Sequence, residues 1–97
     1  MAAKNWLVER RLRDTSARLR QARTDLAVVE EQLAVVREEA EDLRLRAIVS
    51  EHQADLAEHV QGKRHFDAMT RSRADLVHSI DRLSKLQDEL LDRLSAK

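Results

Sequence analysis

The sequence predicts an all-α protein, an antiparallel two-helix coiled-coil hairpin that dimerises into a four-helix bundle. The composition argues against a β protein, because 37% of the residues are charged, 2% are aromatic, one is glycine and none is proline. Apolar residues also recur with a helical period in both halves of the chain. With 97 residues, we expect a single helical-hairpin domain over residues 1–97.

The first predicted helix covers about residues 4–49 and contains two columns of residues that recur every seven positions. These columns are the a and d positions of a heptad, which favours a left-handed supercoil against another helix. The apolar stripe is widest at "LAVVEEQLAVV" and thins to Ala and Ser after Leu43. One column is Leu12, Leu19, Leu26, Leu33, Ala40, Ala47 and Ala54, and the other is Val8, Thr15, Ala22, Val29, Val36, Leu43 and Ser50.

Two places compete for the reversal of the chain. Ser50 suits the N-cap of a second helix, with Gln53 completing an S-x-x-Q capping box. Gly62, the only glycine, suits the C′ position of a first helix that ends near His59. Arms of equal length bury more of the heptad, which favours a turn at about 49–52 and a second helix over about 51–95. The alternative turn lies at about 60–64.

The second half of the chain carries its own stripe at spacings of three and four. Arg73 and Gln87 are polar insertions on this stripe, and such insertions fix the register or the oligomeric state at some loss of stability. Each helix is amphipathic and marginal alone, so the two stripes should pack on each other, on a second copy, or on both. The stripe consists of Phe66, Met69, Arg73, Leu76, Ile80, Leu83, Gln87, Leu90 and Leu94.

Charge is arranged in blocks although the net charge is zero. Residues 1–25 hold seven Lys or Arg against three acidic residues, whereas residues 26–60 hold nine acidic residues against three Arg. A basic end can meet an acidic middle, so this layout favours antiparallel or staggered self-association. It can also steer the basic end to a phosphate backbone. We favour the homodimer over nucleic acid, since only Trp6 can stack on a base.

Apolar residues outside the two stripes are the candidate partner-binding residues. Val28 and Val35 add a third column to the first helix, and Val77 and Leu91 widen the second stripe. Trp6 and Leu7 either cap the end of a bundle or dock a partner beside arginines. A membrane anchor is not expected, because acidic residues are interleaved. The partner-binding set is Trp6, Leu7, Arg10, Arg11, Arg13, Val28, Val35, Val77 and Leu91.

Site chemistry has weak support in the sequence. A helix that begins near Ser50 places His52, Asp55 and His59 on one face, as a weak candidate for a divalent metal, but such spacing arises readily by chance. The absence of cysteine excludes thiolate ligands and disulfides. There is no glycine-rich phosphate loop and no recognisable set of nucleophile, base and orienting residue. We therefore expect no catalytic residue, no bound metal and no cofactor, and so no enzyme.

Three blocks of the sequence carry a family resemblance: "LVERRLRDTSARLRQARTDLAVVEEQLAVVREEAEDLRLRAIVS", "RHFDAM" and "QDELLDRL". They resemble small uncharacterised helical-hairpin (coiled-coil) proteins of high-GC Gram-positive bacteria. The resemblance implies a hairpin whose turn follows the position of Ser50 and contains a proline. This chain has "SEHQADLAEH" there, without proline. The resemblance implies no activity for particular residues.

The function expected from these observations is that of a non-enzymatic protein–protein interaction module, a small scaffold or adaptor. The alternative is an accessory factor of the transcription or translation machinery. Such a factor would contact a large assembly through its basic N-terminal end or through an acidic hairpin tip formed by Glu51, Asp55 and Glu58. No apolar run approaches the roughly 18 residues that span a bilayer, and "MAAKNWLVERR" lacks the apolar core of a signal peptide. We therefore expect a cytoplasmic protein.

Overall fold

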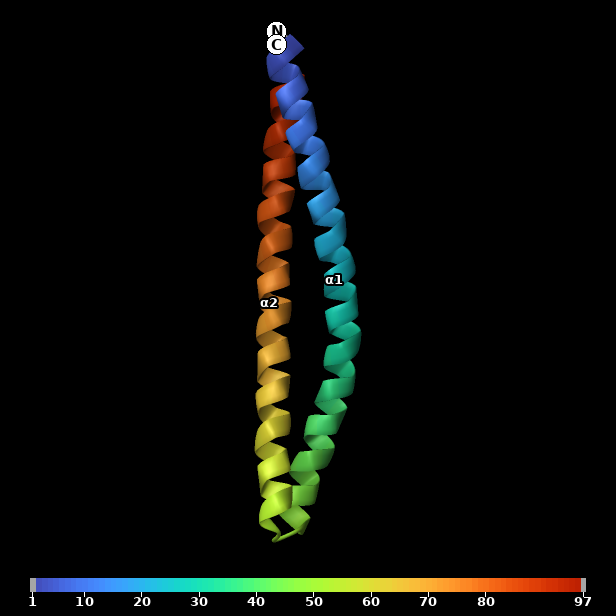
Figure 1. Ribbon diagram of the computed structural model, residues 1–97, viewed down its shortest axis with the longest axis vertical. Helices are drawn as coiled ribbons and strands as arrows, with labels where there is room; N and C mark the ends of the chain where they lie inside the picture. The colour runs from blue at the N-terminus through green and yellow to red at the C-terminus, as the bar shows by residue number, and fades with distance from the viewer. Residues whose placement is uncertain (1, 97) are drawn as a thin grey trace. The chain divides into compact units, whose positions relative to one another are not determined.

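The structure, a computed structural model, describes the backbone of residues 2–96 and the side chains of residues 5–96. It contains two helices, α1 (Ala2–Val49) and α2 (Gln53–Ser95), and no strand among the described residues. The two helices run in opposite directions and pack against each other, as Figure 1 shows. The predicted all-α hairpin is therefore confirmed.

The chain reverses at residues 50–52. The amide of Ser50 donates to the Arg46 carbonyl at 2.8 Å, so Ser50 closes the last turn of α1. The hydroxyl of Ser50 accepts a hydrogen bond from the amide of His52 at 3.2 Å, and the His52 carbonyl accepts the amide of Asp55. His52, not Ser50, therefore stands at the N-cap of α2. The predicted capping box with Gln53 is wrong, because the Ser50 amide already belongs to α1.

The helix pair is divided into two compact units. The terminal unit contains residues 1–26 and 75–97, and the turn unit contains residues 27–74. Each unit consists of one segment of α1 packed on one segment of α2, with its own strip of buried side chains. Gly62 lies inside α2 in the turn unit.

The core of the terminal unit follows the predicted heptad. Thr15, Leu19 and Ala22 of α1 are buried, and Leu90 of α2 is fully buried. The half-buried positions of this unit include five of the predicted positions on α2 and three on α1. Along each helix, the buried and half-buried predicted positions recur at spacings of three and four, as in a coiled coil. These half-buried residues are Val8, Leu12, Leu26, Leu76, Ile80, Leu83, Gln87 and Leu94.

The core of the turn unit is formed by the same two columns of α1. Leu33, Val36 and Ala47 are buried, while Phe66 and Met69 of α2 are half-buried. In both units together, every predicted a and d position of α1 from residue 8 to residue 50 is buried or half-buried. The heptad assignment of α1 is thus confirmed up to the turn.

Two predicted stripe positions are wrong. Ala54 lies beyond the turn, in the first turn of α2, and is exposed because the α1 heptad ends with that helix. Arg73 is exposed as well, because its side chain reaches sideways to the Glu30 carboxylate of α1, with Nη2 3.3 Å from Oε1. The guanidinium remains in water, as expected for a charged group beside a thin core.

The stripe of α2 next to the turn is polar and small instead of apolar. Asp55, His59 and Gly62 continue the three-and-four spacing toward the turn and are half-buried. A Cβ on Gly62 would lie only 2.7 Å from Cδ1 of Leu43. The missing side chain therefore lets Leu43 of α1 lie directly over the backbone of α2.

Candidate interaction surface

More large apolar side chains lie on the surface than in the core. Six apolar residues are buried among the described residues, whereas eleven large ones are between 41% and 85% exposed. Most of the exposed ones belong to α1 and lie off the a and d columns. They are Trp6, Leu7, Val28, Val35, Leu45, Ile48, Val49, Leu56, Val60, Val77 and Leu91.

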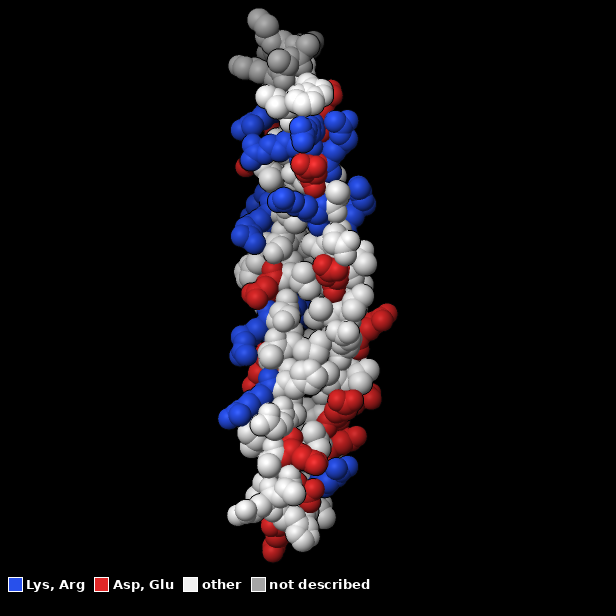
Figure 2. All heavy atoms as spheres, viewed as in Figure 1, with Lys and Arg blue, Asp and Glu red and all other residues white. Residues whose placement is uncertain are grey.

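The basic end, defined as Trp6, Leu7, Arg10, Arg11 and Arg13, lies in the terminal unit. Trp6 and Leu7 are 52% and 58% exposed, and all three arginines are exposed. The guanidinium carbon of Arg10 is 5.7 Å from the centroid of the Trp6 ring, a cation–π contact that orients both side chains. Figure 2 shows that Lys and Arg side chains dominate this part of the terminal unit.

None of the three arginines of the basic end forms an ion pair among the described side chains. Arg18, Arg20 and Arg23, further along α1, form none either. The side chain of Lys4, which belongs to the same basic segment of the sequence, lies outside the described side chains. The described arginines of this segment thus keep their charges available for an anionic partner.

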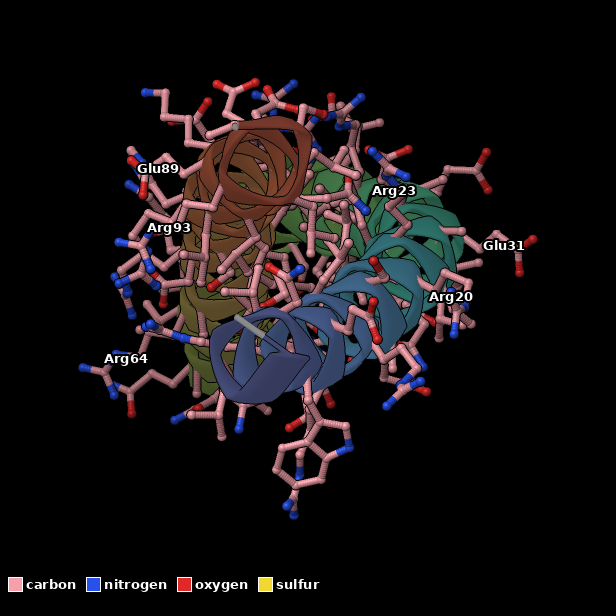
Figure 3. All side chains as sticks on the ribbon, turned by 90° about the horizontal axis from the view of Figure 1, so that it is seen from above. Arg20, Arg23, Glu31, Arg64, Glu89 and Arg93 are labelled. Carbon is pink, nitrogen blue, oxygen red and sulfur yellow. The ribbon has the colours of Figure 1, made fainter. Side chains whose placement is uncertain are left out.

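The valine column, defined as Val28 and Val35, lies on α1 in the turn unit. These side chains are 47% and 56% exposed, and Ala27 and Ala34 beside them are exposed too. The predicted third column therefore exists and is not covered by α2. Glu31 lies between the two valines and, in Figure 3, points away from α2.

A third apolar surface, which the sequence analysis missed, lies next to the turn. Leu45, Ile48 and Val49, here called the turn patch, are 49%, 66% and 85% exposed. Their spacing of three and four places them on one face of α1. This spacing was visible in the sequence, but it lies outside the a and d columns on which the prediction concentrated.

Val77 and Leu91 of α2 are 41% and 46% exposed in the terminal unit. They are two heptads apart and thus occupy the same column of the helix. Ser84, between them in this column, is half-buried. The predicted widening of the α2 stripe therefore leaves two separate apolar side chains at the edge of the core.

The predicted acidic tip is only partly available. Glu51 is exposed, but Asp55 is half-buried in the helix pair. Glu58 pairs with Arg46 across the turn, with Oε2 3.7 Å from Nη1. A partner that approaches the turn therefore meets the exposed Glu51 beside the turn patch, whereas Asp55 is half-buried and Glu58 is already paired.

Another carboxylate of the turn unit, Glu41, is held by a bidentate contact. Arg44 donates from Nη2 to Oε1 at 2.7 Å and from Nε to Oε2 at 3.0 Å. This hydrogen bonding lowers the pKa of Glu41 and raises the pKa of Arg44. Both groups are on the surface, so Glu41 stays ionised and accessible.

The weak metal candidate does not come together. No group of three or more His, Asp or Glu side chains within residues 5–96 is arranged to hold a metal ion. His52 precedes α2 and is exposed, whereas Asp55 and His59 lie on α2 and are half-buried. Nδ1 of His59 is buried without a hydrogen-bond partner, and His59 lines a groove of about 350 Å³ together with three cationic side chains, Arg37, Arg44 and Lys63, and one carboxylate, Glu41. Such cations oppose the binding of a metal cation.

No protein-family model, no curated protein and no solved structure matches this chain. Within the described residues, neither helix has an apolar stretch long enough to cross a membrane. The function is therefore inferred from the residues of the chain itself.

Proposed function

We propose that the chain is a non-enzymatic protein–protein interaction module, a small scaffold or adaptor that acts in the cytoplasm and binds a helical protein surface. One observation carries the proposal. Large apolar side chains of α1 lie outside the contact with α2, in the valine column, in the turn patch and at the basic end. Exposed apolar patches of this kind, bordered by charge, are typical of protein interaction sites.

The energetics favour a partner for these side chains. Fully burying one Val, Leu or Ile side chain contributes about 1.5–3 kcal/mol relative to leaving it in water. Ile48 and Val49 gain little within the hairpin, because they are 66% and 85% exposed. A helix laid across several such positions buries them together, which is how amphipathic helices recognise one another.

A second candidate function is that of an accessory factor of the transcription or translation machinery. The observation that favours it is the row of arginines on the first half of α1, which form no ion pair among the described side chains. Those charges suit a phosphate backbone. Nuclease treatment of a lysate before affinity purification separates this function from the first, because contacts with nucleic acid are then lost whereas contacts with protein remain.

Site-specific photo-crosslinking in cells tests the proposal. A photoreactive amino acid replaces Val35 or Ile48 in the full chain, and the matched control places it at Arg64 of α2. Arg64 is also exposed and, in Figure 3, points away from α1, but it lies outside the apolar surfaces of α1. We expect discrete adducts from positions 35 and 48, and no discrete adduct from position 64.

The adducts themselves decide the outcome. A second copy of this chain or another protein with a helical contact surface, crosslinked at Val35 or Ile48, supports the proposal. No adduct from these positions, or the same pattern from Arg64, contradicts it, since the apolar surfaces would then have no preferred protein neighbour.

A further inference from the structure

A groove on the turn unit collects cationic side chains from both helices. It has a volume of about 350 Å³, and all the residues that line it belong to residues 27–74. Three of its side chains are positively charged and one is negatively charged. This groove, here called the cationic groove, is lined by Arg37, Ala40, Glu41 and Arg44 of α1 and by His59, Lys63 and Phe66 of α2.

The charge of the cationic groove differs from that of its surroundings. The turn unit contains ten Asp or Glu and seven Lys or Arg, an excess of three negative charges. A second groove of this unit, of about 540 Å³, is lined by Glu39 and Glu58 and, among the described side chains, by no Lys or Arg. The cationic groove is therefore a local positive region on an acidic unit, and its concave shape concentrates the field of its charges.

The spacing of the two arginines explains how they come to line one groove. Arg37 and Arg44 are seven residues apart on α1 and thus occupy the same heptad position beside the seam. Their Cα atoms are about 10 Å apart along the helix axis. Lys63 reaches the same groove from α2. An anion in the groove therefore meets cations from both helices.

Two of the three cations are oriented by contacts within the chain. Cζ of Arg37 lies 5.7 Å from the centroid of the Phe66 ring, which is a cation–π contact between the helices. Arg44 is held by its two hydrogen bonds to the Glu41 carboxylate. A ligand therefore finds these side chains already ordered, which lowers the entropy cost of its binding.

The contact between Arg44 and Glu41 also decides which charges are free. Arg44 lowers the pKa of Glu41, so this carboxylate stays ionised at neutral pH and balances the charge of Arg44. Neither Arg37 nor Lys63 forms an ion pair among the described side chains. The cationic groove therefore has two positive charges without a counter-charge.

His59 provides an independent indication that a ligand completes the groove. Its Nδ1 is buried and has no hydrogen-bond partner among the described residues. Buried polar atoms of folded proteins are nearly always paired, and an unpaired one often marks a place for a bound ion or water. Because His59 also lines the cationic groove, a ligand bound there lies beside this ring.

We propose that the cationic groove binds a small molecule that carries a phosphate monoester. Such a group has about 1.5–2 negative charges at pH 7 and three acceptor oxygens, which matches two free cations. The planar guanidinium of Arg37 suits a bidentate contact with the phosphate, and Lys63 adds a compact charge. Phe66 and Ala40, both half-buried, offer apolar contact to the rest of the ligand. The volume of the groove is in the range of small-molecule sites.

Two other classes of anion fit the groove less well. A carboxylate or a sulfate ester has a single negative charge and leaves one of the two free cations without a counter-charge. A nucleic-acid backbone extends beyond the groove, over a unit in which acidic residues are in excess and repel it. The charges thus favour a compact dianion.

Titration of the full chain with phenyl phosphate at low ionic strength, followed by ¹H–¹⁵N NMR, tests the proposal. We expect saturable shifts in the amide signals of the groove residues and in the imidazole signals of His59. The imidazole of His78, which is exposed in the terminal unit, is the internal control and should not shift. No saturable shift, or equal shifts at His59 and His78, would overturn the proposal.

A matched pair of variants separates the groove from a general attraction of anions. Lys63 and Arg64 are exposed neighbours on α2, but Lys63 lines the groove, whereas Arg64 points away from α1 in Figure 3. We expect Lys63→Gln to weaken the binding of phenyl phosphate about tenfold, because a charged hydrogen bond is lost. Arg64→Gln should change it less than about twofold, because water and salt screen this charge. Equal losses would contradict a site in the groove.

Glu41→Gln changes the affinity in the opposite direction. Without this carboxylate Arg44 is free, and the groove then has three cations without a counter-charge. We expect phenyl phosphate to bind at least about threefold more tightly. Glu31→Gln removes an equal charge from a side chain that points away from α2 in Figure 3, and the affinity should stay within about twofold of the wild type. Because damage to the fold does not tighten binding, an unchanged or lower affinity of Glu41→Gln would contradict the proposed charge balance.

The choice of ligand tests the chemical class. Phenyl sulfate has the shape of phenyl phosphate but a single negative charge, so it should bind at least about fivefold more weakly. A short peptide with one phosphoserine carries the monoester on a protein segment. Equal affinity for phenyl sulfate, or binding of this peptide without binding of phenyl phosphate, would overturn the assignment of a small phosphate monoester.

The cationic groove goes beyond the proposed function, and the two fail separately. None of the residues that line the groove belongs to the valine column, the turn patch or the basic end. If positions 35 and 48 give discrete adducts while phenyl phosphate does not bind, the ligand site is wrong and the proposed function holds. If phenyl phosphate binds as expected while these positions give no adduct, the ligand site holds and the proposed function is wrong.

Discussion

Nε2 of Gln87 on α2 donates a hydrogen bond to Oγ of Ser16 on α1 at 3.0 Å, inside the terminal unit. Gln87 occupies a stripe position at which an apolar residue would add more stability. A slip of α2 along α1 by one heptad would separate the two groups and leave Gln87 unpaired in the seam. The hydrogen bond between Gln87 and Ser16 therefore disfavours hairpins in which α2 is shifted along α1.

A double-mutant cycle at this pair should show measurable coupling. Ser16→Ala and Gln87→Ala each lower the free energy of unfolding, and the double variant should lose less than the sum of the two losses. We expect a coupling free energy of about 0.5–1.5 kcal/mol from urea unfolding. Coupling within error of zero would show that the contact contributes nothing in solution.

Leu90 and Leu91 provide a direct comparison of seam and surface. They are neighbours on α2, yet Leu90 is 0% exposed and Leu91 is 46% exposed. Leu90→Ala should cost about 2–4 kcal/mol of unfolding free energy, because it leaves a cavity in the core. Leu91→Ala should cost less than about 1 kcal/mol in dilute solution. Equal losses of unfolding free energy would mean that α2 is rotated about its own axis and faces α1 with a different side.

Gly62→Ala should stabilise the chain slightly, despite the close approach of α1. Alanine is favoured over glycine within a helix by about 1 kcal/mol. The atom that a Cβ would meet, Cδ1 of Leu43, is the end of a flexible side chain beside an open groove of about 540 Å³. Moving this side chain costs about 0.5 kcal/mol if it stays near a rotamer. We expect a net gain of about 0.5 kcal/mol by thermal unfolding, and a loss above about 1 kcal/mol would show that Leu43 cannot move.

The pKa of Glu41 should depend on Arg44. The hydrogen bond from Arg44 lowers this pKa in the folded chain, so the contact favours folding above the unfolded pKa and is lost as the pH falls through the folded pKa. In Arg44→Gln the pKa of Glu41 should rise toward its ordinary value, as followed by carboxyl ¹³C NMR during a pH titration. An unchanged titration would show that the bidentate contact between Arg44 and Glu41 does not form in solution.

The heptad of α1 was predictable because a period of seven identifies the seam without knowledge of the partner helix. Its positions from Val8 to Ser50 are buried or half-buried as expected. The polar part of the α2 stripe was not recognised, because Asp55, His59 and Gly62 carry no apolar pattern. Counting back from Phe66 in steps of four and three leads to all three positions. For this part of α2, the position in the heptad therefore predicts burial better than the residue type does.

The candidate surface was predictable only in part. The valine column and the basic end stood out, since Val28 and Val35 repeat within "LAVVEEQLAVV" and Trp6 stands beside arginines. The turn patch did not, because Leu45, Ile48 and Val49 lie outside the a and d columns on which the prediction concentrated. These positions are on the side of α1 that faces away from α2, so they stay exposed.

The most direct test of self-association through the valine column is a comparison of the wild-type chain with Val28→Lys/Val35→Lys. Sedimentation equilibrium gives the mass over a range of concentrations, and circular dichroism gives the unfolding temperature in dilute solution. We expect the wild-type mass to rise above 11.2 kDa with concentration, while the variant stays at the monomer mass and unfolds in dilute solution like the wild type. A wild-type chain that remains at 11.2 kDa, or a variant that associates equally well, would contradict the account.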